Sequence, residues 1–233
     1  MVDVVVRYHQ APDGQPQPPH ALQGVPLEEH KPLTVAHTYQ GRLGIRTDWW
    51  AATTGKLVPC GTLKQTDTAM VLDFDPDITC FASTPAEVQW SLGGRHGTIV
   101  PMFFARTVGG QRLAVMRPWK QGPDGQVEAE VMHRAAQAAY WTMSVPELPP
   151  AVRLESLRRA AQFRMAQYRS TPQEAALLAE AFSRPRPLRE GAAAAGQPAA
   201  RAWHLLWTGE LITDWDTPML PTSMVWAAGK DNP

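Results

Sequence analysis

Residues 49–76, WWAATTGKLVPCGTLKQTDTAMVLDFDP, predict an extended run, a turn and then an amphipathic helix. Leu63, Met70 and Phe74 recur at approximately helical spacing, which gives the helix one apolar face. Pro76 has no backbone N–H to donate and is expected to end the element. A strand followed by an amphipathic helix favours an α/β fold in which the helix packs against a sheet.

The two tryptophans that open the stretch cannot both be buried in one core. Neighbouring side chains of an extended segment point to opposite faces, so at most one of Trp49 and Trp50 faces the interior. We expect packing against the following helix. Stacking on a nucleic-acid base or contact with a protein partner is the alternative for an exposed tryptophan.

Asp73, Asp75 and Asp77 alternate at the end of the predicted helix and are candidates for a metal site. They lack the glycine and the terminal glutamate of a calcium-binding loop. Aspartate is also a common turn former. We therefore interpret the three residues as a capping and turn cluster.

The sequence after this helix predicts a mixed sheet covered by a second helix. Strands are expected at residues 78–83, 87–92, 98–106, 112–116 and 141–145. The glycine-rich segment GGRHG, residues 93–97, is typical of a hairpin. Residues 126–140 are rich in alanine, glutamate and glutamine and predict a helix that lies on the sheet.

Several of these motifs resemble the TnsA-like heteromeric transposase endonuclease subunits, which have a PD-(D/E)XK nuclease fold. The matching motifs are the double tryptophan with TTG, the helix that runs into LDFDP, YQG at 39–41, Pro101 with FFAR at 103–106, and HLLW at 204–207. The resemblance covers residues 33–226. It implies a restriction-endonuclease-like mixed sheet flanked by helices, followed by a smaller C-terminal domain of winged-helix type.

The acidic residues of such nucleases are missing at the matching positions. On the helix, Gly61 and Gln65 stand at the two glutamate positions. Met102 stands at the metal-binding aspartate, and Met116 and Pro118 stand at the acid and the basic residue of the next strand. Mg²⁺ takes hard oxygen ligands, whereas a thioether is a soft ligand and glycine has no side chain. The resemblance therefore implies a nuclease fold without catalytic residues, a metal site or a cofactor.

Loss of the acids removes a source of repulsion for DNA phosphates and leaves basic residues on or beside the same strands. These residues are Arg95, Arg106, Arg117 and Lys120. We expect them to bind DNA without metal, through phosphate contacts that weaken as salt rises. The main hypothesis is a catalytically inactive accessory or regulatory factor that binds DNA.

Two other functions stay open at this point. One is a scaffold that binds a protein partner, such as a transposase-like subunit or a second copy in a homodimer. The other is an active metal-dependent endonuclease with relocated ligands, which could draw on Asp67, Asp73 or Glu87. Cleavage of plasmid DNA with Mg²⁺ or Mn²⁺ separates the active enzyme from both inactive alternatives.

Composition limits the remaining choices. The 233 residues include 22 basic and 22 acidic side chains, so net charge gives no argument for nucleic acid. Cys60 and Cys80 lack the spacing of a zinc site and are expected to be small buried or half-buried thiols. No apolar run approaches a membrane span, and no nucleotide-binding motif occurs. We expect a cytoplasmic protein, nucleoid-associated if it binds DNA, with no membrane contact and no small-molecule substrate.

Three segments are predicted. Residues 1–32 are a flexible N-terminal segment that allows one short strand at 2–8, because 11–32 are rich in proline, glutamine and glycine. Residues 33–149 form the nuclease-like domain, in which 33–38 alternate as a strand does. Residues 150–233 form the C-terminal helical domain.

The C-terminal domain is predicted to contain three helices and a hairpin. The first helix carries apolar residues from 154 to 168, the second begins at the capping box of Thr171 and Glu174, and 191–200 form a loose connection. The third begins at Pro198 and carries Arg201 and His204, so protein contact is favoured over base readout. Residues 153–189 carry eight arginines and three acids, which predicts a solvated helical surface or a phosphate-contacting face.

Overall fold

The computed structural model describes residues 3–33 and 47–229 of an α/β protein. The chain divides into two compact units, Met1–Glu147 and Leu148–Pro233. Most of the strand predicted at 33–38, and the YQG motif at 39–41, lie outside the described residues. Within the described ranges, no helix has both the length and the apolar character needed to cross a lipid bilayer.

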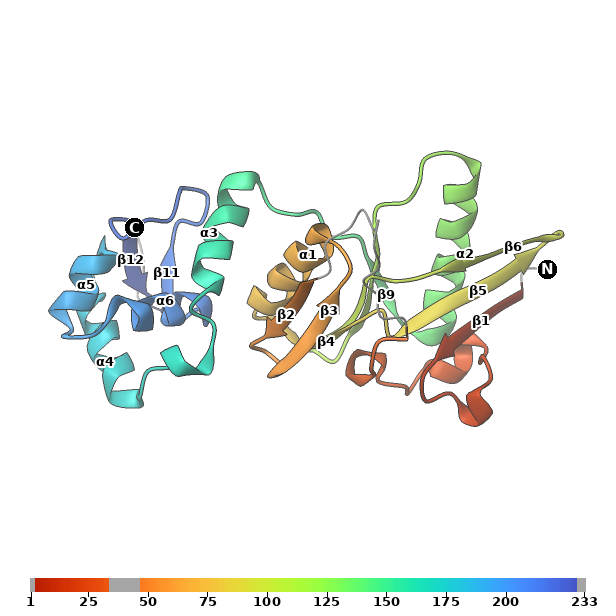
Figure 1. Cartoon of the computed structure of the whole chain (residues 1–233), viewed down its shortest axis with the longest axis horizontal. Helices are drawn as coiled ribbons and strands as arrows, with labels where there is room; N and C mark the ends of the chain where they lie inside the picture. Colours follow the sequence, from red (N-terminus) through yellow and green to blue (C-terminus); the bar gives the residue numbers. More distant parts are fainter. Residues whose placement is uncertain (1–2, 34–46, 230–233) are drawn as a thin grey trace. The chain divides into compact units, whose positions relative to one another are not determined.

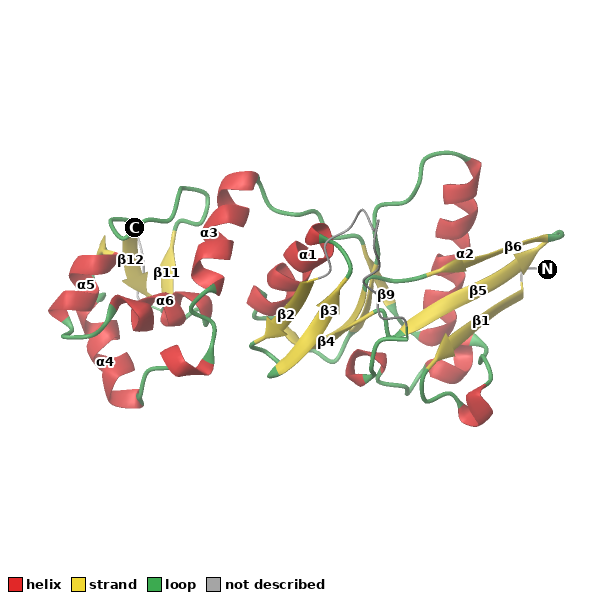
Figure 2. Ribbon diagram, in the orientation of Figure 1, coloured by secondary structure: helices red, strands yellow, loops and turns green. Residues whose placement is uncertain are grey.

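A mixed four-stranded sheet forms the centre of the first unit (Figures 1 and 2). Its strands, in spatial order, are β4 (Ile78–Ser83), β7 (Phe103–Thr107), β8 (Arg112–Val115) and β9 (Thr142–Ser144). The first three are antiparallel and β9 runs parallel to β8. Helix α1 (Leu63–Phe74) precedes β4, and α2 (Pro123–Ala139) connects β8 to β9. The predicted order of helix, antiparallel strands, helix and strand is therefore confirmed for this sheet, but residues 87–92, which were predicted to belong to it, form a strand of another sheet.

A second sheet of the first unit contains β1 (Asp3–Tyr8), β5 (Ala86–Leu92) and β6 (Arg95–Ile99), all antiparallel. The single strand predicted at 98–106 is wrong, because it is divided between the two sheets. Strand β6 ends before Pro101, which has no N–H for a ladder, and β7 begins after it. Gly97 lets β6 approach the Trp90 indole, because a Cβ at Gly97 would lie 2.8 Å from Trp90 Nε1.

The double tryptophan lies on a two-stranded hairpin, β2 (Thr47–Ala51) and β3 (Lys56–Cys60), which contacts α1. Trp49 is buried and Trp50 is half-buried. Trp50 pairs with Leu57, whose side chain is 61% exposed, on the outer face of the hairpin. The prediction that only one tryptophan faces the core is confirmed.

The segment at residues 11–32, predicted as flexible, packs into the first unit. It forms short 3-10 turns, Pro12–Gly14, Pro19–Leu22 and Leu27–Glu29. Leu22 and Leu27 are fully buried in the same core as Met132 of α2. Composition misled the prediction, because a few buried apolar residues are enough to fix the segment once its backbone carbonyl groups are hydrogen-bonded by the sheet.

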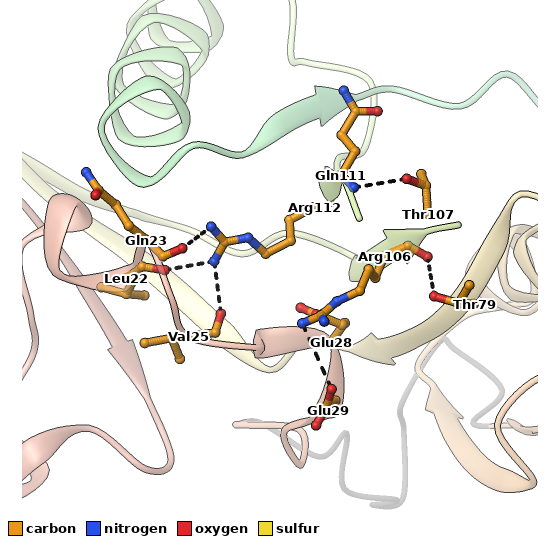
Figure 3. Close-up of polar contacts among 10 residues, drawn as sticks. All are labelled: Leu22, Gln23, Val25, Glu28, Glu29, Thr79, Arg106, Thr107, Gln111 and Arg112. Carbon is orange, nitrogen blue, oxygen red and sulfur yellow. Dashed lines mark hydrogen bonds and ion pairs between the residues drawn. The ribbon is translucent and has the colours of Figure 1, made fainter. Parts of the chain in front are cut away.

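Arg112 of β8 makes several of these hydrogen bonds to the backbone of the segment (Figure 3). Its guanidinium donates hydrogen bonds to the carbonyl oxygens of Leu22 at 3.1 Å and Val25 at 3.3 Å, and to that of Gln23. Arginine presents five donors in a fixed fork and can therefore bind several carbonyls of one turn. The sheet thus holds the segment through its main chain as well as through its leucines.

The second unit contains four helices and a small antiparallel sheet within residues 148–229. The helices are α3 (Ala151–Ala161), α4 (Pro172–Ala181), α5 (Leu188–Ala194) and α6 (Ala199–Trp207). The sheet has the order β10 (Arg186–Pro187), β12 (Met224–Ala227) and β11 (Leu211–Thr213). The capping box of Thr171 and Glu174 and the start of α6 are confirmed.

Two predictions for this unit are wrong. Helix α3 ends at Ala161, and residues 166–168 form a separate 3-10 turn. Residues 191–194 of the predicted loose connection at 191–200 belong to α5, because alanine is the best helix former. Gly191 allows α5 to pack closely, since a Cβ there would lie 2.2 Å from the buried ring of Phe182.

Candidate functional site

A cleft of about 540 Å³ opens in the first unit, and it gathers most of the predicted site residues. It is lined by Pro59, Cys60, Gly61, Thr62, Gln65, Ser83, Thr84, Thr98, Ile99, Val100, Met116, Arg117, Pro118, Trp119, Lys120 and Glu128. These residues come from the β3–α1 junction, the end of β4, the end of β6 and the connection between β8 and α2. A cleft of this volume is in the range of ligand sites.

Gln65 lies at the bottom of this site, buried and held by neutral hydrogen bonds. Its Oε1 accepts from the Gly61 N–H at 2.8 Å, and its Nε2 donates to Ser83 Oγ at 3.0 Å and to the Met102 carbonyl at 3.4 Å. The Thr62 hydroxyl caps α1 by accepting from the Gln65 N–H at 3.1 Å. The site therefore offers both a donor and acceptors, which an amide matches and a carboxylate does not.

Replacing Gln65 with glutamate is expected to lower the free energy of unfolding by about 2 kcal/mol, because a carboxylate oxygen would face the Met102 carbonyl oxygen without a proton to share. Urea denaturation measures this loss. Gln111→Glu, on an exposed turn, is the matched control and should change stability by less than about 0.5 kcal/mol. Equal effects of the two substitutions would contradict the role given to the Gln65 amide.

Met102 and Met116 are both buried beside this glutamine. Their backbones belong to the sheet, since the Met102 N–H donates to Val115 O at 2.8 Å and the Met116 N–H donates to Ser144 O at 2.7 Å. The Met116 side chain packs in the core that includes Phe104. Thioethers here supply packing rather than oxygen ligands. In the described ranges, no three histidine, cysteine, aspartate or glutamate side chains group so as to hold a metal ion.

The rim of the cleft carries two of the predicted basic residues, Arg117 and Lys120, and both are exposed. Arg117 makes no ion pair with any residue that the structure describes, and Lys120 Nζ lies 4.0 Å from Glu128 Oε1. Arg95 is on β6 outside the lining and pairs with Asp124 at 2.5 Å. The rim of the cleft thus carries two exposed cations, of which Lys120 is beside Glu128 and Arg117 has no ion-pair partner among the described residues.

Arg106, the fourth basic candidate, is directed to the N-terminal segment rather than to the cleft (Figure 3). Its Nε donates to Glu28 Oε1 at 2.5 Å, and Glu29 Oε1 lies 3.9 Å from its guanidinium. The Glu28 side chain is only 1% exposed. The hydrogen bond to Glu28 raises the pKa of Arg106 above its ordinary value. Sequence reasoning missed this pair because its members are far apart in the chain.

Cys60 borders the cleft as a buried thiol, as predicted. Burial raises the pKa of the Cys60 thiol to about 11. The thiolate is the nucleophilic form, so Cys60 is protonated and unreactive at neutral pH.

The acids considered for a relocated metal site have structural partners. Asp73 is buried and accepts from Trp49 Nε1 at 3.0 Å, Ala52 N at 3.0 Å, Thr53 N at 2.9 Å and Thr53 Oγ1 at 2.6 Å. It therefore fastens the TTG turn to the end of α1. Asp75 Oδ1 accepts from the Asp77 N–H at 2.9 Å, as a turn cluster does.

Glu87 is tied to the second sheet. Its Oε1 accepts from Arg7 Nε at 2.7 Å and from Gln89 Nε2 at 2.8 Å. The hydrogen bond from Arg7 lowers the pKa of Glu87. The carboxylate is thus engaged in cross-strand contacts of β1 and β5.

In the second unit, neither polar residue of the third predicted helix is displayed for recognition. His204 is buried, with Nδ1 2.8 Å from the Phe163 carbonyl oxygen. Arg201 pairs with Glu174 at 3.1 Å and donates to the Arg169 carbonyl at 2.5 Å. Because α6 is buried from Ala202 to Trp207, it forms the core of its unit and offers little surface for protein contact or base readout.

The sequence alone gave no signal for Ser83, Trp119 and Glu128. Ser83 matters because the fold brings it to Gln65, and Glu128 because α2 carries it next to Lys120. Neither the models of known protein families nor the curated proteins compared with the chain show a match to it.

Proposed function

We propose that this protein has a nuclease fold that no longer cleaves and that it binds duplex DNA at the cleft as an accessory or regulatory factor. The observation that carries the proposal is the composition of the cleft. A fully hydrogen-bonded Gln65 and the thioether of Met116 replace acids, while Arg117 and Lys120 lie at the rim. Glu128 is the one acid among the lining residues and lies beside Lys120, so the two basic residues leave the lining with a net positive charge that attracts phosphate without a divalent ion.

The order of elements supports the finer assignment of the fold. The core that the resemblance implies has a helix, antiparallel strands, a helix and a strand. The elements α1, β4, β7, β8, α2 and β9 follow this order, with β5 and β6 of the second sheet inserted after β4. Gly61, Gln65 and Met116, matched to nuclease acids by the sequence alone, line one cleft. That convergence supports a restriction-endonuclease-like sheet and a degenerate active site.

The second unit fits a winged-helix-like domain. After α3, its helices and strands run α4, β10, α5, α6, β11 and β12, and the last strand lies in the middle of the sheet. A helix, a strand, two helices and a hairpin in this arrangement are typical of winged helices. We propose a cytoplasmic, nucleoid-associated protein that combines the two units.

The proposal predicts metal-independent DNA binding. Arg117→Ala combined with Lys120→Ala is expected to weaken binding to a short mixed-sequence duplex about tenfold in EDTA. The slope of log K against log salt should fall by about 2, because two phosphate contacts are lost. Fluorescence anisotropy at several salt concentrations measures both quantities.

Lys31→Ala combined with Lys56→Ala is the matched control, since it removes the same charge at exposed positions outside the cleft lining. It should leave the salt slope within about 0.5 of the unmodified protein. An equal loss in both variants, or no binding by the unmodified protein at low salt, would rule the proposal out. Cleavage of plasmid with Mg²⁺ or Mn²⁺ would instead support the active-nuclease alternative.

A protein-binding scaffold is the second candidate, and one observation favours it. The outer face of the β2–β3 hairpin displays Leu57, which is 61% exposed, beside the half-buried Trp50 and Pro59. Exposed apolar side chains in contiguous positions are typical of interaction surfaces. Light scattering without nucleic acid tests this candidate, because a homodimer would double the molar mass and Leu57→Asp would abolish the doubling.

A further inference from the structure

Seven of the eight arginines between residues 153 and 189 fall into two groups in the structure. Four are held by contacts within the second unit: Arg153 with Asp216 at 3.7 Å, Arg158 with Glu155 at 3.5 Å, Arg159 with the Met219 carbonyl at 2.7 Å and Arg164 with the Ala161 carbonyl at 2.5 Å. Arg169 is exposed between α3 and α4. The other three follow one another along the chain: Arg184 precedes β10, Arg186 is on β10 and Arg189 is in the first turn of α5.

The side chains of these three arginines make no ion pair or hydrogen bond with any residue that the structure describes. Arg184 and Arg189 are exposed, and Arg186 is half-buried. Glu190 is the only acid within residues 184–190, so the segment carries three positive charges and one negative charge. This group differs from the four held arginines because its guanidinium donors are left to solvent.

The backbone that carries the group is fixed. Arg184 and Arg186 each precede a proline, which restricts both residues to extended conformations. Arg186 pairs with Val225 of β12, and the Arg189 N–H donates to Pro221 O at 2.9 Å. Two residues of extended chain rise about 6.6 Å, so the side chains start from defined and separate points. A fixed backbone lowers the entropy that ordering these side chains on a ligand would lose.

We propose that Arg184, Arg186 and Arg189 form a second phosphate-binding surface, the arginine edge, which contacts the backbone of duplex DNA. Guanidinium groups bind phosphate oxygens in bidentate fashion, and a row of separate cations suits a polymer with a charge at every nucleotide. The contact would position DNA without reading its sequence, since base recognition needs groups that reach base edges. The surface belongs to the second unit and does not depend on the cleft.

The test replaces all three arginines with alanine in the full chain. Binding to a short mixed-sequence duplex in EDTA is expected to weaken about tenfold or more, and the slope of log K against log salt should fall by about 2 to 3. The control triple Arg153→Ala, Arg158→Ala and Arg169→Ala removes the same charge from the same unit but leaves the arginine edge intact. It should lower the slope by less than about 1.

Replacement of the three arginines with lysine separates charge from structure. The lysine variant should keep most of the salt slope, whereas a structural role would be lost equally with lysine and with alanine. A thermal melt by circular dichroism checks folding, and we expect the midpoint of the alanine variant to stay within about 2 °C, since exposed side chains contribute little. Equal affinity and slope in the alanine triple and the unmodified protein would overturn the arginine edge.

The alanine triple is also measured in the Arg117→Ala and Lys120→Ala background. If the triple weakens binding and the cleft double does not, the arginine edge stands and DNA binding at the cleft fails. The reverse pattern overturns the arginine edge alone. Absence of binding by the unmodified protein at low salt overturns both.

Discussion

Replacing Asp73 with alanine is expected to lower the free energy of unfolding by about 3 kcal/mol, a large share of the stability of an ordinary domain. The substitution removes the common acceptor of the Trp49 indole and of two donors of Thr53. Trp49 is buried, so its N–H would lose its partner without gaining water. The donors of Ala52 and Thr53 are more exposed and can be hydrated, which keeps the loss below the sum of four buried bonds.

Urea denaturation followed by tryptophan fluorescence measures this loss. Asp75→Ala is the matched control, because Asp75 is an exposed aspartate two residues away that closes only a turn with Asp77. It should lower stability by less than about 1 kcal/mol. EDTA should not change the stability of the unmodified protein through this residue, whereas a metal role for Asp73 requires EDTA to destabilise it. Similar losses in the two variants would contradict the clamp between α1 and the TTG turn.

The Asp73 clamp also shows what the sequence could and could not reveal. Local signals identified α1 by its apolar spacing, α4 by its capping box and the turn role of Asp75. They could not show that TTG and LDFDP form one structure, since the bond from Thr53 to Asp73 joins residues 20 positions apart. The periodicity of a sequence indicates the helix or strand to which a residue belongs. Which residue it contacts in another element depends on how the elements pack.

The errors have the same origin. Residues 11–32 have the composition of a linker, yet Arg112 binds their carbonyl groups from a strand that is distant in the sequence. The strand predicted at 98–106 divides at Pro101, because the chain leaves one sheet there and enters another. In each case tertiary contacts outweighed local composition.

The sequence predicted part of the candidate cleft, because several positions that match nuclease acids line it in the structure. Gly61, Gln65 and Met116 were singled out from the sequence, and the fold brings them together with Arg117 and Lys120. Arg106 was grouped with them because it lies on a neighbouring strand. The sequence indicated that Arg106 lies in a strand but could not tell that β7 directs its side chain to Glu28.

The pair of Arg106 and Glu28 gives the other large expected effect. Replacing Arg106 with methionine keeps the length of the side chain but leaves the carboxylate of Glu28, which is 1% exposed, without its cation. Its Oε2 is already buried without a partner among the described residues. Removing one member of a buried pair costs about 3 to 5 kcal/mol, and the partial exposure of Arg106 favours the lower value.

The double variant Arg106→Met and Glu28→Gln decides whether the loss of stability comes from the buried, unpaired carboxylate of Glu28. With the charge gone, the double variant should be about 2 kcal/mol more stable than Arg106→Met alone, which a double-mutant cycle in urea measures. Hydrogen exchange should show where the loss occurs. The amides of Glu29 and His30, which bond to Pro26 O and Leu27 O, should lose protection before those of β7. If the double variant is less stable than the single one, the ion pair does not hold the N-terminal segment to the sheet.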